Sequence, residues 1–499
     1  MQIQTSGPSW VRVLLLGTVA AVVARANDIP TARQVKTAVV KNNNQFAIEL
    51  HRTLTKAAPQ QNSVCSPNSV SNALGMLYVG ADGRTRKEMA ATLHIRVSNN
   101  DLGRLLNLSS PTRKRPTYRL GITVADNDQG GVKVTHVADG GPAAKFGIKP
   151  GDILLAIDGR PLRSQVDFQS AIDYSTGCID VKRRGGQTQR VTDITVTMIA
   201  DQSQPNPSQN KNLDYLRIAN AIWMDRGFPV TPEYSNLLAS TFGAKATSVD
   251  FDNPVTATAR INKWVADETR GSIDNLLSAT DVDKTTQLVV TNAIDFQGTW
   301  AKTFDPERTR AKPFTTAKGE TISVPTMVTS QALRHFNAAE FQAVELPFRD
   351  STLALLILLP RQEQGLAAIE QGLSADVLDK VVGNLKSTQV VLTLPRFEIT
   401  SDSALEDAMQ AMGMTSAFNS NAADFSGISG TKGLYLSKVV HKARIKVDEE
   451  GATASAASAA VGVARGPFSV PFQANHPFLF VLRDTITDSI IFIGRTTHP

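Results

Sequence analysis

The chain has 499 residues, of which 41% are hydrophobic and 20% are charged. This composition favours a globular protein with more than one folding unit and excludes a collagen-like or broadly disordered chain. The 52 lysines and arginines against 46 aspartates and glutamates leave a net charge of +6, too small and too scattered to indicate a nucleic-acid partner. The two cysteines, Cys65 and Cys178, cannot make a disulfide framework, and no Cys/His cluster suggests a zinc site.

The N-terminal segment has the pattern of an export signal. Arg12 precedes an apolar run over residues 13–23, and small residues follow within 24–26. This order predicts a secretory signal peptide over residues 1–26, with cleavage before Asn27. The alternative is an uncleaved anchor, but the run is shorter than an ordinary membrane span. We therefore expect a secreted, soluble, extracellular protein, or a periplasmic one if the source is bacterial.

Two stretches have the composition of linkers. Residues 109–116 are polar, basic and interrupted by two prolines, and residues 201–212 contain no aliphatic side chain. Neither segment can bury apolar surface, so both favour surface connections. Between them, residues 117–200 are long enough for one small domain. This domain is predicted to interrupt a larger one formed by 27–116 and 213–499.

Residues 117–200 alternate like short strands around a small alanine-containing helix and a Pro-Gly-Asp turn. The run GPAAKFGIKPGDILLAIDG, beginning at Gly141, resembles a PDZ domain of the kind carried by bacterial HtrA-type proteases. The resemblance implies a loop that holds the terminal carboxylate of a peptide, which adds as an extra strand beside a helix over 164–174. The loop residues it implies are Arg119, Leu120, Gly121 and Ile122, and the groove residues are Val166, Phe168 and Ile172. The alternative is a spacer or exosite that binds no peptide.

The interrupted larger unit combines helical and strand-like patterns. Helical periodicity covers residues 43–56 and 68–79, and the second helix is predicted to begin with a capped start at Ser66 and Pro67. Strand-like runs follow, which indicates a large mixed α/β unit with substantial sheet. These runs cover 216–223, 287–294, 352–359, 390–394 and 490–493.

Several motifs in this unit resemble the serpin family of serine protease inhibitors. They are the runs NSVCSPNS from Asn62, NKWV from Asn262, TNAIDFQGTW from Thr291, LPRF from Leu394, ADFSG from Ala423, LYLSKVVHKA from Leu434 and FIGR from Phe492. The resemblance implies the mixed α/β serpin fold, with three β-sheets, surrounding helices and an exposed reactive loop.

The same resemblance assigns residues to two places where the main sheet of that fold opens. It places Ser66, Ser69 and His441 in the shutter, and Asn292 and Trp300 on the strand that leads to the breach. One residue near them departs from the family pattern. Cys65 occupies a position where the family usually has a large apolar residue, and a cysteine packs there as a smaller hydrophobe.

The run from Val447, VDEEGATASAASAAVGVAR, is the segment with the clearest functional pattern. Three carboxylates and a glycine precede an uncharged stretch, residues 452–464, in which alternate positions are all small. A strand with one such face can enter a preformed sheet at little steric or desolvation cost, although the composition alone also fits a flexible linker. The resemblance implies the hinge of a reactive loop over residues 449–475. Its hinge residues are Glu449, Glu450, Gly451, Ala452, Ala454 and Ala456.

The resemblance further implies a trap that works once. It places the scissile bond between Arg465 and Gly466, and an arginine suits the carboxylate-based primary pocket of trypsin-like serine proteases. Pro467 limits the backbone shapes just beyond the cut. After the protease forms an acyl-enzyme with Arg465, the chain from Ala452 inserts as a new strand and deforms the protease. The implied partner is the protease, bound covalently by a monomeric inhibitor that needs no metal or other cofactor.

Two rival functions are open at this level. HtrA-type PDZ segments usually accompany serine proteases, but the glycine-flanked serine in SGISG, from Ser426, belongs to a serpin motif, and His441 falls in the shutter. The second rival is a non-inhibitory serpin that acts as a carrier, chaperone or peptide-binding scaffold. The hinge lacks the bulky, charged or proline residues typical of such relatives, which favours inhibition. The inserted domain would then tether the inhibitor to a C-terminal tail.

Overall fold

The structure is a computed structural model. It describes residues 32–96, 118–127, 130–157, 160–162, 165, 168, 178–185, 191–197, 199–200, 215–278, 280–349, 351–452 and 469–499. The predicted signal peptide, both predicted linkers, Ala454, Ala456, Arg465, Gly466, Val166 and Ile172 lie outside these residues. Among the helices that the structure describes, none is both long and apolar enough to cross a membrane.

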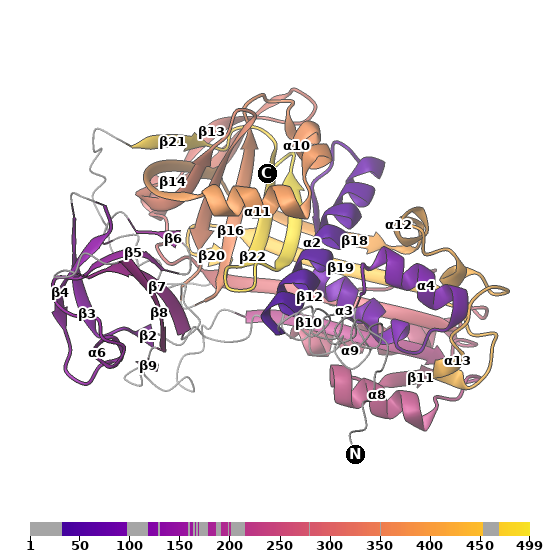
Figure 1. The fold of residues 1–499 in the computed structure, drawn as a ribbon. Helices are drawn as coiled ribbons and strands as arrows, with labels where there is room; N and C mark the ends of the chain where they lie inside the picture. Colours follow the sequence, from indigo (N-terminus) through magenta and orange to yellow (C-terminus); the bar gives the residue numbers. More distant parts are fainter. Residues whose placement is uncertain are drawn as a thin grey trace, which may run out of the picture.

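One sheet of the large unit has the strand order β11-β10-β12-β19-β18, with the short strand β20 added beside β12. The bounds are β10 Tyr215–Asp225, β11 Ala246–Val249, β12 Leu288–Thr299, β18 Phe397–Ala404, β19 Lys438–Val447 and β20 Gly451–Ala452. Figure 1 shows these long strands crossing the large unit side by side. Alternate residues of β12 face opposite sides. Leu288 and Val290 therefore share a core with the helix α3 (Pro67–Tyr78), and Val289 shares another with α9 (Pro254–Thr269).

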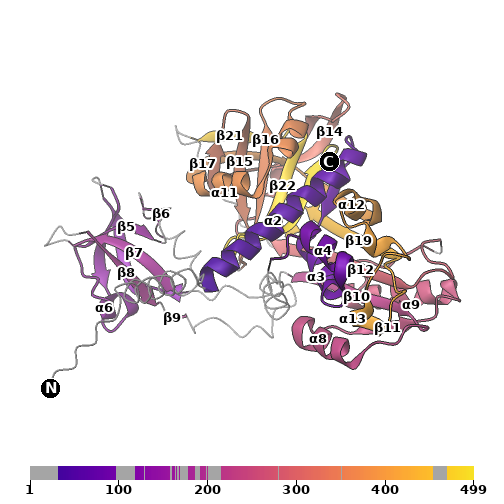
Figure 2. The same cartoon turned by 45° about the vertical axis from the view of Figure 1, so that its right-hand side comes forward.

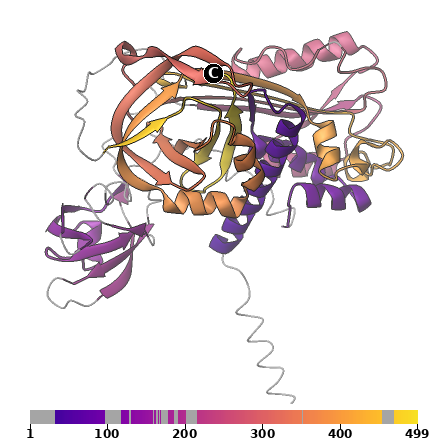
Figure 3. The same ribbon diagram turned by 90° about the horizontal axis from the view of Figure 1, so that it is seen from above.

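The second sheet has nine strands in the order β1-β23-β22-β16-β15-β14-β17-β21, with β13 on β14. The long strand β14 pairs with β13 at one end and with β15 at the other, so it joins two halves. With the sheet around β12, these halves make the three sheets that the sequence predicted. Figure 3 shows the nine-stranded sheet curving. The bounds are β1 Ser63–Cys65, β13 Arg310–Thr315, β14 Thr321–Asn337, β15 Phe341–Pro347, β16 Leu353–Pro360, β17 Lys386–Pro395, β21 Val470–Gln473, β22 Phe478–Asp484 and β23 Ile490–Thr496.

Helices cover these sheets. They are α2 Ala32–Ala57, α3 Pro67–Tyr78, α4 Gly83–Thr92, α8 Pro232–Phe242, α9 Pro254–Thr269, α10 Leu366–Gly372, α11 Ala375–Asn384, α12 Glu406–Ala411 and α13 Ser426–Ser429, with 3-10 turns η2 Pro306–Arg308 and η3 Ser416–Phe418. Pro67 begins α3 as predicted, but the predicted side-chain cap is wrong. Ser66 occupies the cap position, yet its hydroxyl donates to the carbonyl of Ile491 at 2.7 Å. The strand β23 offers this buried acceptor, so the serine joins sheet and helix instead.

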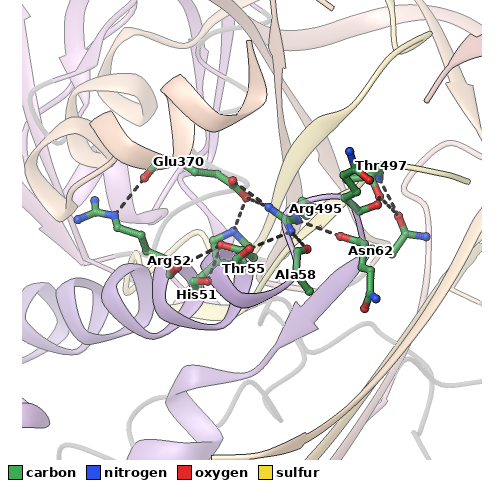
Figure 4. A network of polar contacts seen from close by, with 10 residues as sticks. His51, Arg52, Thr55, Ala58, Asn62, Glu370, Arg495 and Thr497 are labelled. Atoms are coloured by element: carbon green, nitrogen blue, oxygen red, sulfur yellow. Dashed lines mark hydrogen bonds and ion pairs between the residues drawn. The ribbon is translucent and has the colours of Figure 1, made fainter. Parts of the chain in front are cut away.

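A buried ionic network fixes β23 to α2 and α10 (Figure 4). The Arg495 guanidinium lies 3.1 Å from Glu370, whose carboxylate also lies 3.0 Å from Nε2 of His51. Arg495 additionally donates to the carbonyls of Thr55 and Ala58, at the end of α2. A cation at this place satisfies the last carbonyls of the helix and interacts favourably with its dipole. The C-terminal strand is thereby held by charge as well as by apolar packing.

The inserted unit has its own sheet and its own core, and Figure 2 shows it as a distinct body. The strand order is β3-β4-β5-β7-β8, with β6 on β5 and a separate pair of β2 and β9. The bounds are β2 Tyr118–Arg119, β3 Ile122–Asp126, β4 Val132–Val137, α6 Pro142–Lys145, β5 Ile153–Ile157, β6 Arg160–Pro161, β7 Cys178–Arg184, β8 Val191–Thr197 and β9 Ile199–Ala200. The short alanine-containing helix and the following turn and strand appear where the sequence predicted them.

Candidate functional site

The backbone that follows β19 is held at three successive carbonyls. The backbone N–H of Trp300 donates to the carbonyl of Glu450 at 2.8 Å, and that of Phe304 donates to the carbonyl of Glu449 at 2.8 Å. The indole Nε1 of Trp300 donates to the carbonyl of Asp448 at 2.9 Å. The predicted hinge therefore begins as an ordered segment, positioned by the chain that follows β12.

Trp300 acts as the packed support for this segment. Its ring is 1% exposed and stacks on Phe348, with centroids 4.4 Å apart and planes inclined by 20°. Phe296 packs edge-on against the same phenylalanine at 4.9 Å. Offset stacked and edge-to-face aromatic pairs add specific orientation to the apolar packing. The indole N–H is thus held where it reaches the carbonyl of Asp448.

Glu449 is anchored through its side chain as well. The Nε of Arg396 donates to both carboxylate oxygens at 2.8 Å, and the hydroxyl of Thr309 also donates to the carboxylate. Burial alone raises the pKa of Glu449, but the hydrogen bonds and the charge of Arg396 outweigh it and leave that pKa below its ordinary value. Glu449 is therefore an ionised group with satisfied oxygens. Sequence reasoning missed the roles of Arg396 and Thr309.

Gly451 allows the chain to turn back beside β12. Its φ is +145°, and a Cβ built on it would overlap the carbonyl oxygen of Gly298 and lie 2.7 Å from the Cα of Thr299. Only glycine fits this close approach of two backbones. The next two positions form β20, in which Gly451 pairs with Thr299 and Ala452 pairs with Gly298, antiparallel to β12. The loop hinge thus already contributes the first pairs of a new strand, which sequence reasoning did not predict.

The strands β12 and β19 are direct neighbours below this point. Residues 289–296 pair in parallel with residues 438–445, so no strand lies between them over that length. A strand that continued β20 would run antiparallel to both and would have to separate them. We call the paired boundary between β12 and β19 the closed slot, and Gly451 and Ala452 lie at its entrance.

The predicted shutter residues meet around His441 of β19, which is fully buried and contacts β12 and the start of α3. The backbone N–H of Ser66 donates to its Nε2 at 3.1 Å, so the proton sits on Nδ1, which donates to the side-chain oxygen of Asn292. The amide nitrogen of Asn292 donates to Ser69 and to Asn220. Burial lowers the pKa of His441 to about 4. Asn220, contributed by β10, was not predicted.

In the inserted unit, the predicted carboxylate loop lies between β2 and the edge strand β3. Gly121 has a φ of +75°, its carbonyl accepts from the N–H of Ala138 at 2.8 Å, and the carbonyl of Leu120 accepts from Ala143 at 3.0 Å. The structure describes Arg119 only as backbone of β2, and Ile122 begins β3.

The predicted groove of this unit is described only at its beginning. Phe168 is helical and buried, and it packs in the core with Leu120 and Val124. The amide of Gln165 donates to the carbonyl of Val124 on β3 at 2.6 Å, a contact that sequence reasoning missed. The helical residues Gln165 and Phe168 therefore lie beside the edge strand, which agrees with the arrangement expected for strand addition.

Two family models match the chain. The model described as serpin (serine protease inhibitor) matches residues 41–128 and 165–499. The chain belongs to the serpin family. The model described as PDZ domain matches residues 110–178, inside the predicted insertion and its N-terminal linker. This serpin thus carries a PDZ domain within its chain.

Curated relatives are similar at moderate identity. The leukocyte elastase inhibitor of Xenopus laevis is 36% identical over 291 residues, which cover 57% of this chain and 77% of that protein. Antithrombin-III of Mus musculus is 34% identical over 296 residues, covering 58% of this chain and 63% of that protein. Human neuroserpin is 30% identical over 359 residues, covering 70% and 85%.

Solved structures agree on the fold. Native protease nexin-1 with heparin superposes with a TM-score of 0.66 at 24% identity, covering 93% of this chain and 100% of that chain. Uncleaved ovalbumin gives a TM-score of 0.67 at 22% identity, covering 92% and 100%. As a member of this family with these relatives, the protein is a protease inhibitor rather than a protease. The comparisons do not favour the carrier or scaffold alternative.

Proposed function

We propose that this serpin inhibits serine proteases of trypsin-like specificity as a trap that works once, with Arg465 and Gly466 as the reactive bond. The proposal rests on where the hinge lies, at the entrance to the closed slot. Gly451 and Ala452 already pair with β12, while β12 and β19 are still paired with each other below them. The loop sequence beyond, small and uncharged at alternate positions, has the composition that a buried central strand requires.

The chemistry of the trap belongs to the protease. Its serine oxygen attacks the carbonyl carbon of Arg465, the amide nitrogen of Gly466 leaves with a proton, and an ester joins the two proteins. Insertion of the loop then separates β12 from β19 and supplies the free energy that deforms the protease. An arginine before the cut pairs with a carboxylate at the base of the primary pocket, which supports trypsin-like targets.

The remaining parts of the proposal concern place and partners. The pattern over residues 1–26 supports export, so the inhibitor acts outside the cell or, in a bacterium, in the periplasm. Its proposed oligomeric state is a monomer. The PDZ domain, similar in its GPAAKFGIKPGDILLAIDG run to those of HtrA-type proteases, binds the C-terminus of a peptide. Gly121, the position of β3 at the end of the described sheet and the helical residues beside it support this role.

The deciding experiment mixes the protein with trypsin and follows the products on a denaturing gel. A covalent complex that survives boiling in detergent is the expected result, and Arg465→Ala should abolish it. Cleavage of the loop without a complex would refute the inhibitor proposal. Ala452→Arg should convert the inhibitor into a substrate, because insertion would bury an unpaired guanidinium. Thr453→Arg is the matched control, since residue 453 directly follows Ala452 and would face the opposite side of an inserted strand.

A separate measurement addresses the PDZ proposal. A library of peptides with free C-termini is screened for binding to the whole protein, and amidated versions of the bound peptides serve as controls. Loss of binding on amidation is expected, because the loop at Gly121 would lose its carboxylate. Binding that tolerates amidation, or none at all, would refute the peptide proposal while leaving the trap untouched.

A further inference from the structure

The described residues expose few large apolar side chains. Phe146, Val191 and Val255 are the ones with more than a third of their surface exposed, at 40%, 44% and 71%. Single exposed apolar residues are ordinary on protein surfaces. Phe146 differs from the other two because the backbone fixes its position and because cations flank it.

The turn that carries Phe146 is closed by backbone hydrogen bonds. The N–H of Phe146 donates to the carbonyl of Pro142 at 3.2 Å, and that of Ile148 donates to the carbonyl of Ala143 at 2.9 Å. Gly147, with a φ of +74°, allows the helix α6 to end here in the left-handed conformation. Ala143 and Ile148 are both buried in the core of the domain. Because both of these residues are fixed in the core, the turn between them holds Phe146 at the surface.

A second contact braces the same turn from the sheet. Arg183, on β7, donates to the carbonyl of Gly147 and pairs with the buried Asp152 at 2.8 Å. Asp152 in turn accepts from the backbone N–H of Lys149 at 2.9 Å. The Asp152 carboxylate is thus buried and engaged by these bonds, and the exposed charges on the turn itself are positive.

Lys145 and Lys149 supply that charge. Both are exposed, they stand on either side of Phe146, and no salt bridge joins either lysine to an acid in the part of the chain that the structure describes. Figures 1 and 2 both show α6 at the periphery of the inserted domain. We call Lys145, Phe146 and Lys149 the Phe146 turn.

We propose that the Phe146 turn docks the inserted domain on the surface of an anionic phospholipid bilayer. An exposed aromatic ring on a turn fixed by backbone hydrogen bonds suits the boundary between headgroups and acyl chains, which needs no matching pocket. The two lysines are exposed and flank the ring in sequence, and each would contribute electrostatic attraction to an anionic leaflet. The opposite end of α6 adjoins Gly121, so docking would bring the peptide-binding loop close to the membrane. The proposal does not depend on peptide binding or on protease inhibition.

The test is sedimentation of the full-length protein with vesicles of phosphatidylcholine, with and without phosphatidylserine. Binding to the anionic vesicles alone is expected, and it should fall as salt rises because the attraction is screened. Phe146→Ser should weaken partition about tenfold, from the lost apolar insertion. Lys145→Glu and Lys149→Glu should each weaken it at least about fivefold, from the lost attraction to anionic lipid.

Val255→Ser is the matched control, since Val255 is more exposed than Phe146 but lies in the serpin domain beside Asp252. It should bind vesicles like the parent protein. Circular dichroism of each variant establishes that the fold is intact. As a direct readout, the tryptophan fluorescence added by Phe146→Trp should shift to shorter wavelength when anionic vesicles are present. The fluorescence added by Val255→Trp should not shift. No binding to anionic vesicles, or equal binding by Phe146→Ser, would overturn the proposal, as would binding to acidic peptides but not to vesicles.

Discussion

Arg396 donates its Nε–H to both carboxylate oxygens of Glu449, each at 2.8 Å, and so ties the junction of β17 and β18 to the first residue of the loop hinge. The carboxylate is buried, whereas the Arg396 side chain is 46% exposed. The ion pair therefore sits at the boundary of protein and solvent, where it holds the entrance of the slot. Breaking it releases the hinge without leaving a deeply buried cation.

The first prediction concerns this ion pair. Glu449→Gln should lower the free energy of unfolding by about 1 kcal/mol, because solvent screens part of the attraction and can rehydrate Arg396. The variant should also lose inhibitory activity faster on warming, since the hinge is less firmly placed. Urea unfolding and residual trypsin inhibition measure the two effects. Glu398→Gln, which breaks the exposed pair of Glu398 with Arg444, is the control and should change neither. Equal effects of both substitutions would contradict the prediction.

A second prediction tests whether β20 exists in solution. Gly451→Ala places a Cβ against the carbonyl of Gly298, and the strain is relieved only if the hinge leaves β12. Amide exchange at Trp300, whose N–H donates to Glu450, should become faster. Gly319→Ala is the matched control, because its φ is also positive, at +82°, but no atom lies within 4 Å of the added Cβ. Unchanged exchange at Trp300 in Gly451→Ala would show that the hinge is not paired there.

Much of the sheet is predictable from local pattern. The strand β16, Leu353–Pro360, lies within one residue of the predicted run because it is an uninterrupted apolar segment, as a strand buried on both faces requires. The strands β13 and β14 were missed, since their residues alternate irregularly between exposed and buried and include Pro313 and Pro325. Their identity as strands depends on pairing with each other, which no local window contains.

The candidate site likewise combines residues that a local motif predicts with partners that lie far away in the chain. Glu449 and Gly451 belong to one continuous motif, so their place in the hinge could be predicted from the sequence alone. Their partners could not: Arg396 and Thr309 lie 53 and 140 positions away from Glu449 in the chain. Asn220 reaches the shutter from another strand for the same reason. The predicted cap at Ser66 was wrong because a distant strand competes for its hydroxyl.

The third prediction is a pH dependence centred on His441. Its pKa is about 4 in the fold and 6.5 as an ordinary histidine, so the unfolded chain binds more protons between these values. Stability should therefore fall as the pH drops below 6.5, by about 2 kcal/mol on reaching about pH 5. Glu449 has a lowered pKa and contributes in the same direction, but only below its ordinary value of 4.5.

Urea unfolding at neutral pH and at about pH 5 measures this dependence. His441→Gln should be less stable at neutral pH, because it loses its bonds to Ser66 and Asn292, yet its stability should change less between the two pH values. His136→Gln, at an exposed position of the inserted domain, should keep the full pH dependence. A His441 variant with an undiminished slope would assign the acid sensitivity to another group.

The last prediction concerns the network that holds the C-terminal strand. Glu370→Gln removes the charge that neutralises Arg495, whose side chain is 3% exposed and cannot rehydrate without opening β23. The loss should be about 3 kcal/mol, as for a buried pair that loses one partner. Asp267→Asn, which breaks the exposed pair of Lys263 and Asp267, should cost less than about 0.5 kcal/mol. A loss as small as that of the control would mean that the carbonyls of Thr55 and Ala58 satisfy Arg495 without the carboxylate. In that case β23 would be held by packing and neutral hydrogen bonds, and the ionic account of its anchoring would be wrong.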